Sequence, residues 1–368
     1  LIYFVYKFLN NNNTKNIIYV SIFAALLINT KVLGIIPVIL FISILIFDNL
    51  DKKNKNFIQV GIFFSSTFFF IYLFWPYLWS DMFANLSFAF KNILKIHEEL
   101  IIITKYFNKY TSSNNVEWHY RITWFLITTP VTIIFFCISG IALMVKNLIN
   151  KILLIDEIKK FDLTKNEFLD LFLLFVLILS AFVTIKFNNT KFGGWRHLYY
   201  LYPIIVYFGI YFINNLIISK NKIIYNFLII LFSFNSIYVF NWMVKNHPYQ
   251  YVYFNFISKD YSVKSFDLDY WGVSHKDALK KILDEDNRSI ITVSSKGFTS
   301  LKPSIFLLNK ENQKRLKLVN IKQADYIIDN NMKRIRGNYV INKENYSKFF
   351  QIMVNNFPIN TVYKRIKK

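Results

Sequence analysis

Residues 193–213 have the sequence GGWRHLYYLYPIIVYFGIYFI, and this stretch decides the class of fold. Residues 198–213 carry no charged side chain and are apolar enough to enter a lipid bilayer as a helix. Trp195, Arg196 and His197 directly precede them. These three side chains suit the surface of a bilayer, where they can hold a polar group, better than its interior. The stretch therefore predicts a membrane helix that starts at a binding surface.

The composition of the whole chain supports this interpretation. Of its 368 residues, 54% are hydrophobic and 19% are aromatic, which exceeds the usage of average soluble domains. A bilayer core about 30 Å thick requires about 20 mostly apolar residues per crossing helix. The clear candidate crossings are residues 57–75, 122–145, 168–185, 198–213 and 224–242. Shorter candidates are residues 17–29 and 32–47, and residues 1–9 resemble the end of another crossing.

The start of the chain and its change of composition predict the domain organisation. The sequence begins at Leu1 without Met and lacks the charged, apolar and cleavable regions of a signal peptide. We therefore expect a fragment whose missing part is N-terminal and membrane-embedded. We expect a multi-pass membrane domain over residues 1–244 and a small α/β domain over residues 245–368.

The α/β domain has recognisable local patterns. Ser274 is the expected cap of a helix over residues 275–283. An amphipathic helix is expected over residues 343–357. Short β-branched stretches predict strands at residues 289–295, 303–308, 324–329, 338–342 and 360–366.

The loops between the crossings alternate between two faces of the membrane. Residues 48–56, 146–166 and 219–223 fall on one face, and their slightly higher lysine density places that face in the cytoplasm. All five histidines and all seven arginines fall on the other face, and the seven tryptophans lie there or at its boundary. An aromatic belt alone would occupy both interfaces. We therefore expect a binding surface on the outer face of a bacterial cytoplasmic membrane, with the α/β domain on the same side.

Two arginines are the main candidates for binding an anion. The sequence uses lysine for most of its cations, so Arg121 and Arg196 next to the membrane suggest sites that need a planar guanidinium. This group binds phosphate through two parallel hydrogen bonds, which an ammonium cannot do. Anchoring to headgroups or loop carbonyls is the alternative role. His197 and His119 are weaker candidates for orienting the phosphate or an acceptor.

Aromatic residues near these cations are candidates for the wall of a substrate cavity. Tyr249, Tyr251 and Tyr253 alternate, so in an extended segment they would share one face. They form either an ordinary membrane-interface cluster or a surface for a sugar or a lipid headgroup. Trp195 and Trp118, which precede the two arginines, are expected to line the same cavity.

Six ordered blocks carry a resemblance to a known family. They resemble bacterial integral-membrane glycosyltransferases of the GT-C class, and within it family 39 and its relatives, which include dolichyl-phosphate-mannose-type protein mannosyltransferases and the aminoarabinose transferases of lipid A. The blocks are TKVLGIIPVIL (30–40), FWPYLW (74–79), WHYRITWFLITTP (118–130), GGWRHLYYLYP (193–203), HPYQYVYFN (247–255) and DLDYWGVSHKDAL (267–279).

The resemblance implies a polytopic α-helical, GT-C-like membrane core, a polyprenyl-phosphate sugar donor, an extracytoplasmic acceptor, and inversion at the anomeric carbon. It also implies a catalytic carboxylate in a loop that would precede Leu1, so we expect the chain alone to be inactive. Asp267 and Asp269 are able to share a strand face and a proton or a metal ion, or they are solvated or capping carboxylates. Asp81, Glu98, Glu99 and Glu117 lie on the same face but are not assigned the role of base.

Other classes of function lack their signals in this sequence. No glycine-rich phosphate loop, zinc-type Cys/His spacing or nucleophile elbow occurs, and no cofactor is assigned. The net charge of +22 is scattered lysine without a basic stripe, so nucleic acid is not an expected partner. The alternatives are a transporter or flippase for a lipid-linked sugar, which should show charges at mid-membrane depth or repeated halves, and a non-catalytic membrane scaffold.

Overall fold

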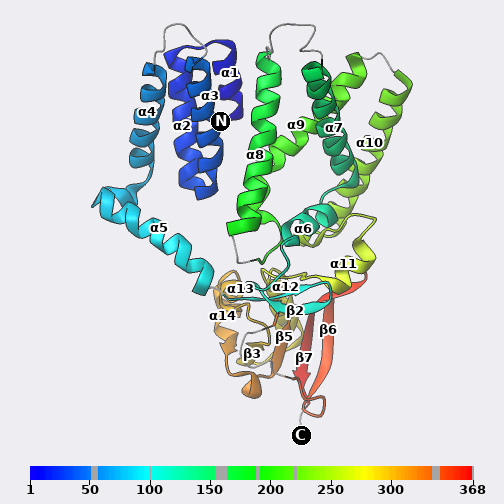
Figure 1. Ribbon diagram of the computed structural model, residues 1–368. Coiled ribbons are helices and arrows are strands. Elements are labelled where there is room, and N and C mark those ends of the chain that lie inside the picture. The colour runs from blue at the N-terminus through cyan, green and yellow to red at the C-terminus, as the bar shows by residue number, and fades with distance from the viewer. Residues whose placement is uncertain are drawn as a thin grey trace. The chain divides into compact units, whose positions relative to one another are not determined.

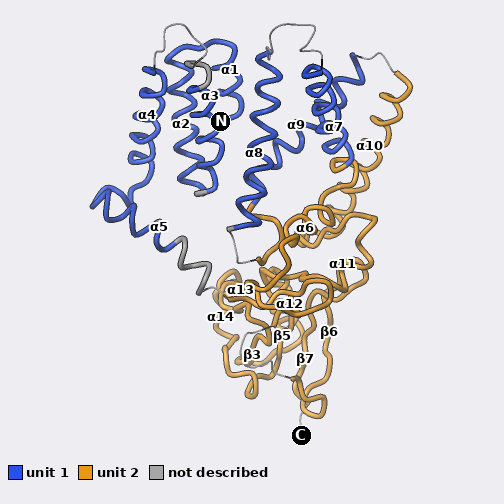
Figure 2. The backbone as a smooth tube through the Cα atoms, in the orientation of Figure 1, with its two compact units in different colours: residues 1–97, 135–188, 198–220 blue, residues 98–134, 189–197, 221–368 orange. Residues whose placement is uncertain are grey.

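The computed structural model describes residues 1–50, 57–99, 101–153, 164–187, 191–218, 222–333 and 340–366. The chain divides into two compact units, each assembled from separate segments (Figure 2). Unit 1 comprises Leu1–His97, Phe135–Asn188 and Leu198–Lys220. Unit 2 comprises Glu98–Ile134, Asn189–His197 and Asn221–Lys368.

Unit 1 is helical. Its N-terminal helices are α1 (Ile2–Asn10), α2 (Thr14–Thr30), α3 (Ile35–Leu50) and α4 (Ile58–Phe74), followed by α5 (Met82–Glu99). Helix α2 packs against α1, α3 and α4 (Figure 1). The Phe41 ring sits between two others at the centre of this group, with centroids 5.3 Å from Phe8 and 5.0 Å from Phe63. These edge-on contacts help to fill the core of the bundle, together with buried apolar residues such as Ile17 and Leu45.

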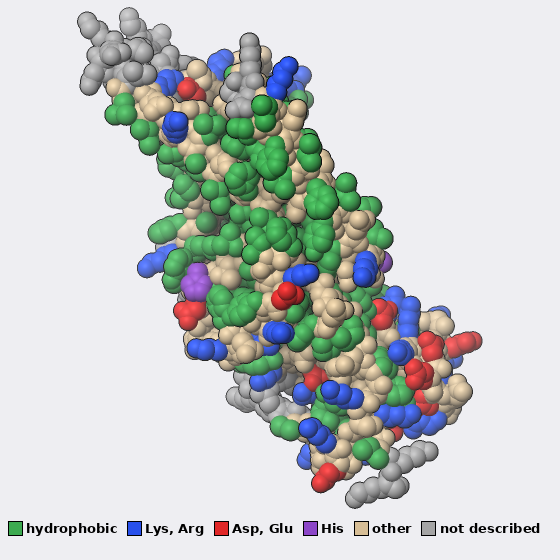
Figure 3. Space-filling model, turned by 90° about the vertical axis from the view of Figure 1, so that its right-hand side faces the viewer, with side chains coloured by type: hydrophobic (Ala, Val, Ile, Leu, Met, Phe, Trp, Pro, Cys, Tyr) green, Lys and Arg blue, Asp and Glu red, His purple; other side chains and the backbone are tan. Residues whose placement is uncertain are grey.

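Four described helices are long and apolar enough to cross a membrane, and they match four of the expected crossings. They are Val131–Leu153 (α7), Lys165–Lys186 within α8, Arg196–Ile218, which contains α9 (Tyr202–Ile218), and Lys222–Lys245 (α10). Hydrophobic side chains cover the helical part in the view of Figure 3, whereas charged side chains gather on the part that contains the sheet. Along α10, large apolar side chains such as Phe227, Ile230 and Phe234 are exposed. The chain therefore has the helices of a membrane protein.

A close backbone contact joins α7 to α9. A Cβ atom added at Gly140 of α7 would lie 1.8 Å from the carbonyl oxygen of Phe208 in α9. Only glycine fits at this distance, and small residues are a common means of bringing membrane helices together.

One expected crossing is interrupted. Residues 122–145 do not form a single helix, because α6 (Tyr120–Thr128) ends before Pro130 and α7 begins after it. Proline lacks the N–H group that would continue the helical ladder. The carbonyl groups exposed at the break are bound by Asn255, whose backbone N–H donates to Ile127 (2.8 Å) and whose side chain donates to Leu126 (2.6 Å) and Thr129 (3.0 Å).

The α/β part of unit 2 contains a five-stranded mixed sheet. Its strand order is β4 (Leu316–Leu318), β3 (Ile291–Ser295), β5 (Tyr326–Asp329), β7 (Phe357–Arg365) and β6 (Tyr346–Val354). Strand β3 pairs in parallel with β4 and β5, whereas β7 pairs antiparallel with β5 and β6. Helix α12 (Ser274–Glu285) buries Leu279 and Ile282 against one face of the sheet. A separate pair of strands, β1 (Ile103–Tyr106) and β2 (Lys109–Ser112), forms a hairpin.

The expected strands at 289–295, 324–329 and 360–366 are confirmed by β3, β5 and β7, but three other expectations for this part are wrong. Residues 343–357 contain strand β6 instead of a helix, because Asn355 and Asn356 both have positive φ and form a two-residue hairpin turn into β7. Residues 303–306 belong to the short helix α13 (Lys302–Phe306), which has Pro303 in its first turn. Residues 340–342 are not in a strand, and residues 338–339 lie outside the described residues.

The expected cap of α12 is displaced by one residue. Ser274 is the first residue of α12 and does not cap it. Its hydroxyl donates a hydrogen bond to Asp269 instead. The remaining elements of unit 2 are α11 (Lys259–Ser265), α14 (Lys310–Arg315) and several short 3-10 turns.

Candidate functional site

Arg196 is positioned by a turn that requires glycine. Gly193 and Gly194 have φ values of 64° and 70°, which side chains other than glycine rarely adopt. The N–H of Gly194 donates to the hydroxyl of Tyr120 (3.2 Å), which fixes the turn against α6. The 3-10 turn Arg196–Leu201 follows directly and leads into α9. The turn therefore sets the direction of Arg196 at the first residue of a candidate membrane span.

The guanidinium of Arg196 lies between two aromatic rings. Its central carbon is 4.3 Å from the ring centroid of Trp271 and 4.8 Å from that of Phe192. Its Nε–H donates to Nε2 of His197 (3.3 Å). Stacking on aromatic faces is a property of the planar guanidinium. The two rings restrain the orientation of the planar Arg196 guanidinium, whose N–H groups point outward from its edge.

Arg196 lines a cavity of about 280 Å³ that lies entirely within unit 2. The cavity wall includes the aromatic rings of Phe192, Tyr270, Trp271 and Phe298, the hydroxyls of Thr299 and Ser300, and the carboxylate of Asp267. Mostly apolar walls with a few polar groups are typical of small-ligand sites. One cation and one carboxylate therefore share this cavity.

Asp267 is buried, so its interpretation as a solvated carboxylate is wrong. Its Oδ2 accepts a hydrogen bond from the Thr104 hydroxyl (2.5 Å), and its Oδ1 accepts one from the backbone N–H of Lys105 (3.0 Å). Both donors belong to β1, so the β1–β2 hairpin holds this carboxylate in place. Burial raises the pKa of Asp267 to about 6, against the opposing effect of these hydrogen bonds and of the Lys105 charge. A carboxyl group with this pKa can exchange a proton near neutral pH.

Asp269 has a structural environment of its own and does not share one with Asp267. It is fully buried and accepts hydrogen bonds from the hydroxyls of Tyr251 and Ser274 and from the N–H of Val273 (2.9 Å). These contacts cap the start of α12, which agrees with the capping interpretation and excludes the solvated one. Burial also raises the pKa of Asp269 to about 6. Among the described residues, no cluster of three or more His, Cys, Asp or Glu side chains is arranged to hold a metal ion.

The structure separates the two pairs of predicted phosphate ligands. His197 contacts Arg196 directly, but Arg121 and His119 do not line the cavity. Arg121 is buried in α6, and desolvation lowers its pKa to about 10. His119 uses Nδ1 to contact the hydroxyls of Tyr106 (2.6 Å) and Thr123 (3.2 Å). The contacts of His119 and Thr123 with Tyr106 therefore pack α6 against the β1–β2 hairpin.

The three tyrosines of residues 247–255 do not form an extended wall. Residues Gln250–Val252 form a 3-10 turn, so the expectation of one shared face is wrong. The hydroxyls of Tyr249 and Tyr251 donate to Asp277 and Asp269, and Tyr253 packs edge-on against Trp242 with centroids 5.1 Å apart. Within the described residues, none of the three tyrosines lines the cavity.

The predicted tryptophans have different environments. Trp195 is buried, with its ring nitrogen donating to the Thr128 hydroxyl (3.0 Å) and its ring edge-on to Phe125. Trp118 is 61% exposed and packs against His119. Neither lines the cavity, so their expected roles in a substrate cavity remain predictions.

Among the unassigned carboxylates, Asp81 caps the start of α5 through the N–H of Ala84 (3.0 Å), and Glu117 is exposed. The side chains of Glu98 and Glu99 lie outside the described part of the chain.

Sequence reasoning missed Phe192 and Trp271, although both lie close to features that it singled out. Phe192 precedes the Gly193–Gly194 turn, and Trp271 belongs to the same DLDYWGV block as Asp267. Residues 270–272 direct Trp271 toward Arg196 through a turn in which Gly272 has a φ of 69°. The sequence signal that could have found Trp271 is the pair of aromatic residues, Tyr270 and Trp271, directly before Gly272.

Comparison with known proteins adds no relative: no family model, no curated protein and no solved structure matches this chain. The resemblance therefore rests on the six sequence blocks alone.

Proposed function

We propose that this chain is part of a membrane glycosyltransferase that moves a sugar from a polyprenyl-phosphate donor to an extracytoplasmic acceptor. The observation that carries the proposal is the cavity lined by both Arg196 and Asp267, at the first residue of a helix apolar and long enough to cross a membrane. A guanidinium suits the phosphate, and aromatic rings suit a sugar.

Arg196 binds the donor phosphate in this proposal. As the bond between the anomeric carbon and the phosphate oxygen breaks, the electron pair passes to the phosphate, which gains negative charge. A donor group that is already oriented stabilises this charge without reorganising. The stacking of Arg196 between Phe192 and Trp271 provides that orientation. His197 assists by accepting the Nε–H, which helps to orient the guanidinium.

Asp267 serves as the proton acceptor within the described cavity. An acceptor hydroxyl attacks the anomeric carbon, its proton passes to the Asp267 carboxylate, and polyprenyl phosphate leaves with the electron pair. A pKa of about 6 keeps the group mostly ionised at neutral pH while allowing it to take the proton. This assignment competes with the carboxylate expected upstream of Leu1, and the two are separated by the Asp267 variant described below.

The test of the Arg196 role uses polyprenyl phosphate itself, because this probe does not require the sugar to be known. Arg196→Lys keeps the charge but loses both the planar contact and the paired hydrogen bonds. We expect the Kd for polyprenyl phosphate, measured on the full-length protein in detergent, to rise by roughly 10- to 100-fold, in line with the loss of a charge-assisted contact. Polyprenol, which lacks the phosphate, should bind both proteins equally.

Arg315→Lys is the matched control. Arg315 donates to the backbone carbonyls of Leu283 and Arg288 in the α/β part and does not line the cavity. It reports the general cost of replacing arginine by lysine, and it should leave the affinity for polyprenyl phosphate unchanged. If Arg196→Lys binds polyprenyl phosphate as tightly as the unaltered protein, the phosphate role of Arg196 is wrong.

A further inference from the structure

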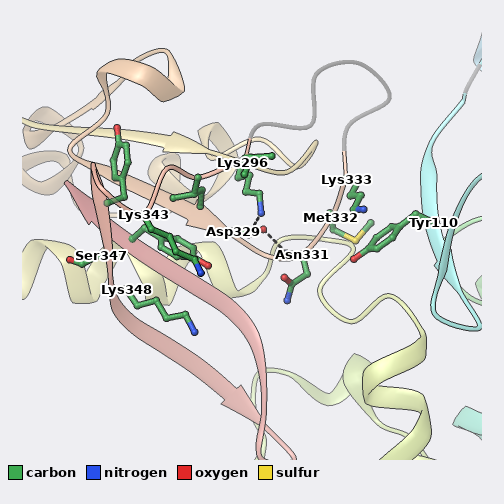
Figure 4. A pocket seen from close by; sticks show the side chains of 13 residues that line it. Tyr110, Lys296, Asp329, Asn331, Met332, Lys333, Lys343, Ser347 and Lys348 are labelled. Carbon is green, nitrogen blue, oxygen red and sulfur yellow. Dashed lines mark hydrogen bonds and ion pairs between the residues drawn. The ribbon is translucent and has the colours of Figure 1, made fainter. Parts of the chain in front are cut away.

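A second and larger hollow lies in the α/β part of unit 2, with a volume of about 580 Å³ (Figure 4). We call it the lysine pocket, because Lys296, Lys333, Lys343 and Lys348 line it. Asp329 is the single carboxylate among its lining residues. No sequence pattern pointed to this pocket, because its lysines are scattered over three separate segments.

The lysines are spread across the sheet, because Lys348 of β6 pairs with Tyr363 of β7, which pairs with Ile327 of β5. Lys296 directly follows β3, and Asp329 is the last residue of β5, the parallel neighbour of β3. The N–H of Lys296 donates to the carbonyl of Ile328 (2.9 Å), which holds the two strand ends side by side. Lys348 comes from β6. The carboxyl ends of parallel strands are a common position for ligand sites, because the chain diverges there and leaves a crevice.

The charge of the pocket is only partly compensated. Lys296 forms an ion pair with Asp329, with an Nζ–Oδ2 distance of 2.6 Å. Lys343 and Lys348 are exposed, and within the described residues neither has a carboxylate at ion-pair distance. Lys333 stacks on the Tyr110 ring, with its Nζ 3.6 Å from the centroid. The lining therefore offers several ammonium groups to a ligand with more than one negative charge.

The walls of the pocket suit a sugar as well as an anion. Tyr110 and Tyr363 contribute rings that are at least partly exposed, and Ile341 contributes apolar surface, whereas Tyr346 and Met332 are buried in the wall. Flat aromatic faces pack against sugar rings, while lysines on flexible stems reach separate phosphate or carboxylate groups. A ligand that carries both features is an acidic oligosaccharide.

The lysine pocket adjoins the Arg196 cavity through a small hollow of about 110 Å³. This hollow shares Tyr110, Asn331 and Met332 with the lysine pocket, and it shares Asp267 and Met332 with the Arg196 cavity. All three lie within unit 2. The small hollow therefore lies between the lysine pocket and Asp267.

We propose that the lysine pocket binds an acidic oligosaccharide and, resting on the proposed function, that this oligosaccharide is the acceptor. The anionic groups contact Lys343, Lys348 and Lys333, and the end of the chain reaches Asp267 through the small hollow. The pocket thus selects the class of acceptor, while the Arg196 cavity holds the donor.

The test compares two labelled glycans that differ only in charge, phosphorylated mannopentaose and unphosphorylated mannopentaose, on the full-length protein in detergent. We expect the phosphorylated glycan to bind at least 10-fold more tightly, and we expect its binding to weaken as the salt concentration rises. The double variant Lys343→Gln/Lys348→Gln should lose most of this preference. The control is Lys310→Gln/Lys314→Gln, which removes two exposed lysines of α14 outside the pocket and should keep the preference.

Three outcomes would overturn the proposal. The first is equal binding of the two glycans, and the second is an unchanged preference in the pocket variant. The third is binding of phosphatidylglycerol vesicles that depends on Lys343 and Lys348 while neither soluble glycan binds, which would assign the lysines to lipid headgroups. Polyprenyl-phosphate binding is measured on the same samples, so that the donor proposal and the acceptor proposal fail separately.

Discussion

Arg196 depends on immediate neighbours in the chain, whereas Asp267 depends on a hairpin far from it in the sequence. Arg196 follows the Gly193–Gly194 turn and stacks on Phe192, while Asp267 faces the hairpin that provides the Thr104 hydroxyl. The sequence predicted Arg196 because arginine is rare in a lysine-rich chain and this one stands at a membrane boundary. It named Asp267 together with Asp269 but did not assign it the role of base, because burial of Asp267 depends on the β1–β2 hairpin, which lies far away in the chain and has no clear sequence signal.

Replacing Asp267 tests both its chemistry and its burial. If Asp267 accepts the proton, Asp267→Asn should lower the transfer rate by about 100- to 10,000-fold. The rate limb that rises with an apparent pKa near 6 should disappear in the variant. Donor affinity should stay unchanged, because the Arg196 contact remains. Full transfer by Asp267→Asn would return the role of base to a carboxylate outside this chain.

Asp267→Asn should also change how the stability of the protein depends on pH, and this change is measured separately from the transfer rate. The pKa of Asp267 is raised from 3.8 to about 6, so the folded protein binds the proton more tightly than the unfolded chain does. Stability contributed by this group is present at low pH and is lost as pH rises from about 4 to 6. We expect the free energy of unfolding of Asp267→Asn, relative to the unaltered protein, to increase by about 3 kcal/mol across this range. Thermal unfolding in detergent at pH 4 and pH 7.5 measures the change.

At the scale of helices and strands, the local sequence pattern predicted some elements and not others. The four long apolar helices could be predicted from the sequence, because each contains an apolar run long enough to cross a bilayer. Strand β6 was predicted as a helix because its residues lack strict alternation, and the Asn355–Asn356 turn that pairs it with β7 was overlooked. The end of α6 before Pro130 could have been predicted, because proline cannot continue the helical hydrogen bonds. The hydrogen bond from Asn255 to the Leu126 carbonyl could not, because it joins segments that are distant in the sequence.

Asn255 offers a test at the scale of the element. Asn255→Ala leaves the buried carbonyls of Leu126 and Thr129 without their side-chain donor. A buried acceptor without a partner costs about 1–3 kcal/mol, so the variant should be less stable by about that amount. Asn246→Ala removes one bond to the Trp242 carbonyl and is the control, with a smaller loss expected. Equal thermal stability of Asn255→Ala and the unaltered protein would mean that the break is held by other contacts.

At the scale of the whole molecule, unit 2 gathers most of the loops that the sequence assigned to one face of the membrane. It unites Glu98–Ile134, Asn189–His197 and Asn221–Lys368. Helix α10 also belongs to unit 2, whereas residues 76–97 of the same expected face belong to unit 1. Hydrophobicity predicts which loops share a face, but it carries no information on which residues meet there. The Arg196 cavity, the small hollow and the lysine pocket are each lined by residues from separate segments of the chain, so the sequence alone did not predict them.

The last prediction concerns the side of the membrane that holds the Arg196 cavity and the α/β part, and labelling of introduced cysteines tests it. In a Cys137→Ser background, cysteines at Asn115 and Lys317, both exposed in unit 2, should react with an impermeant thiol reagent on intact cells. Cysteines at Asn166 and Lys222, exposed at the starts of α8 and α10, should react only after the membrane is opened. The physical basis is that each crossing reverses the side of the chain, and that lysine-rich loops remain in the cytoplasm. The reverse pattern would place the Arg196 cavity on the cytoplasmic face, where an extracytoplasmic acceptor could not reach it.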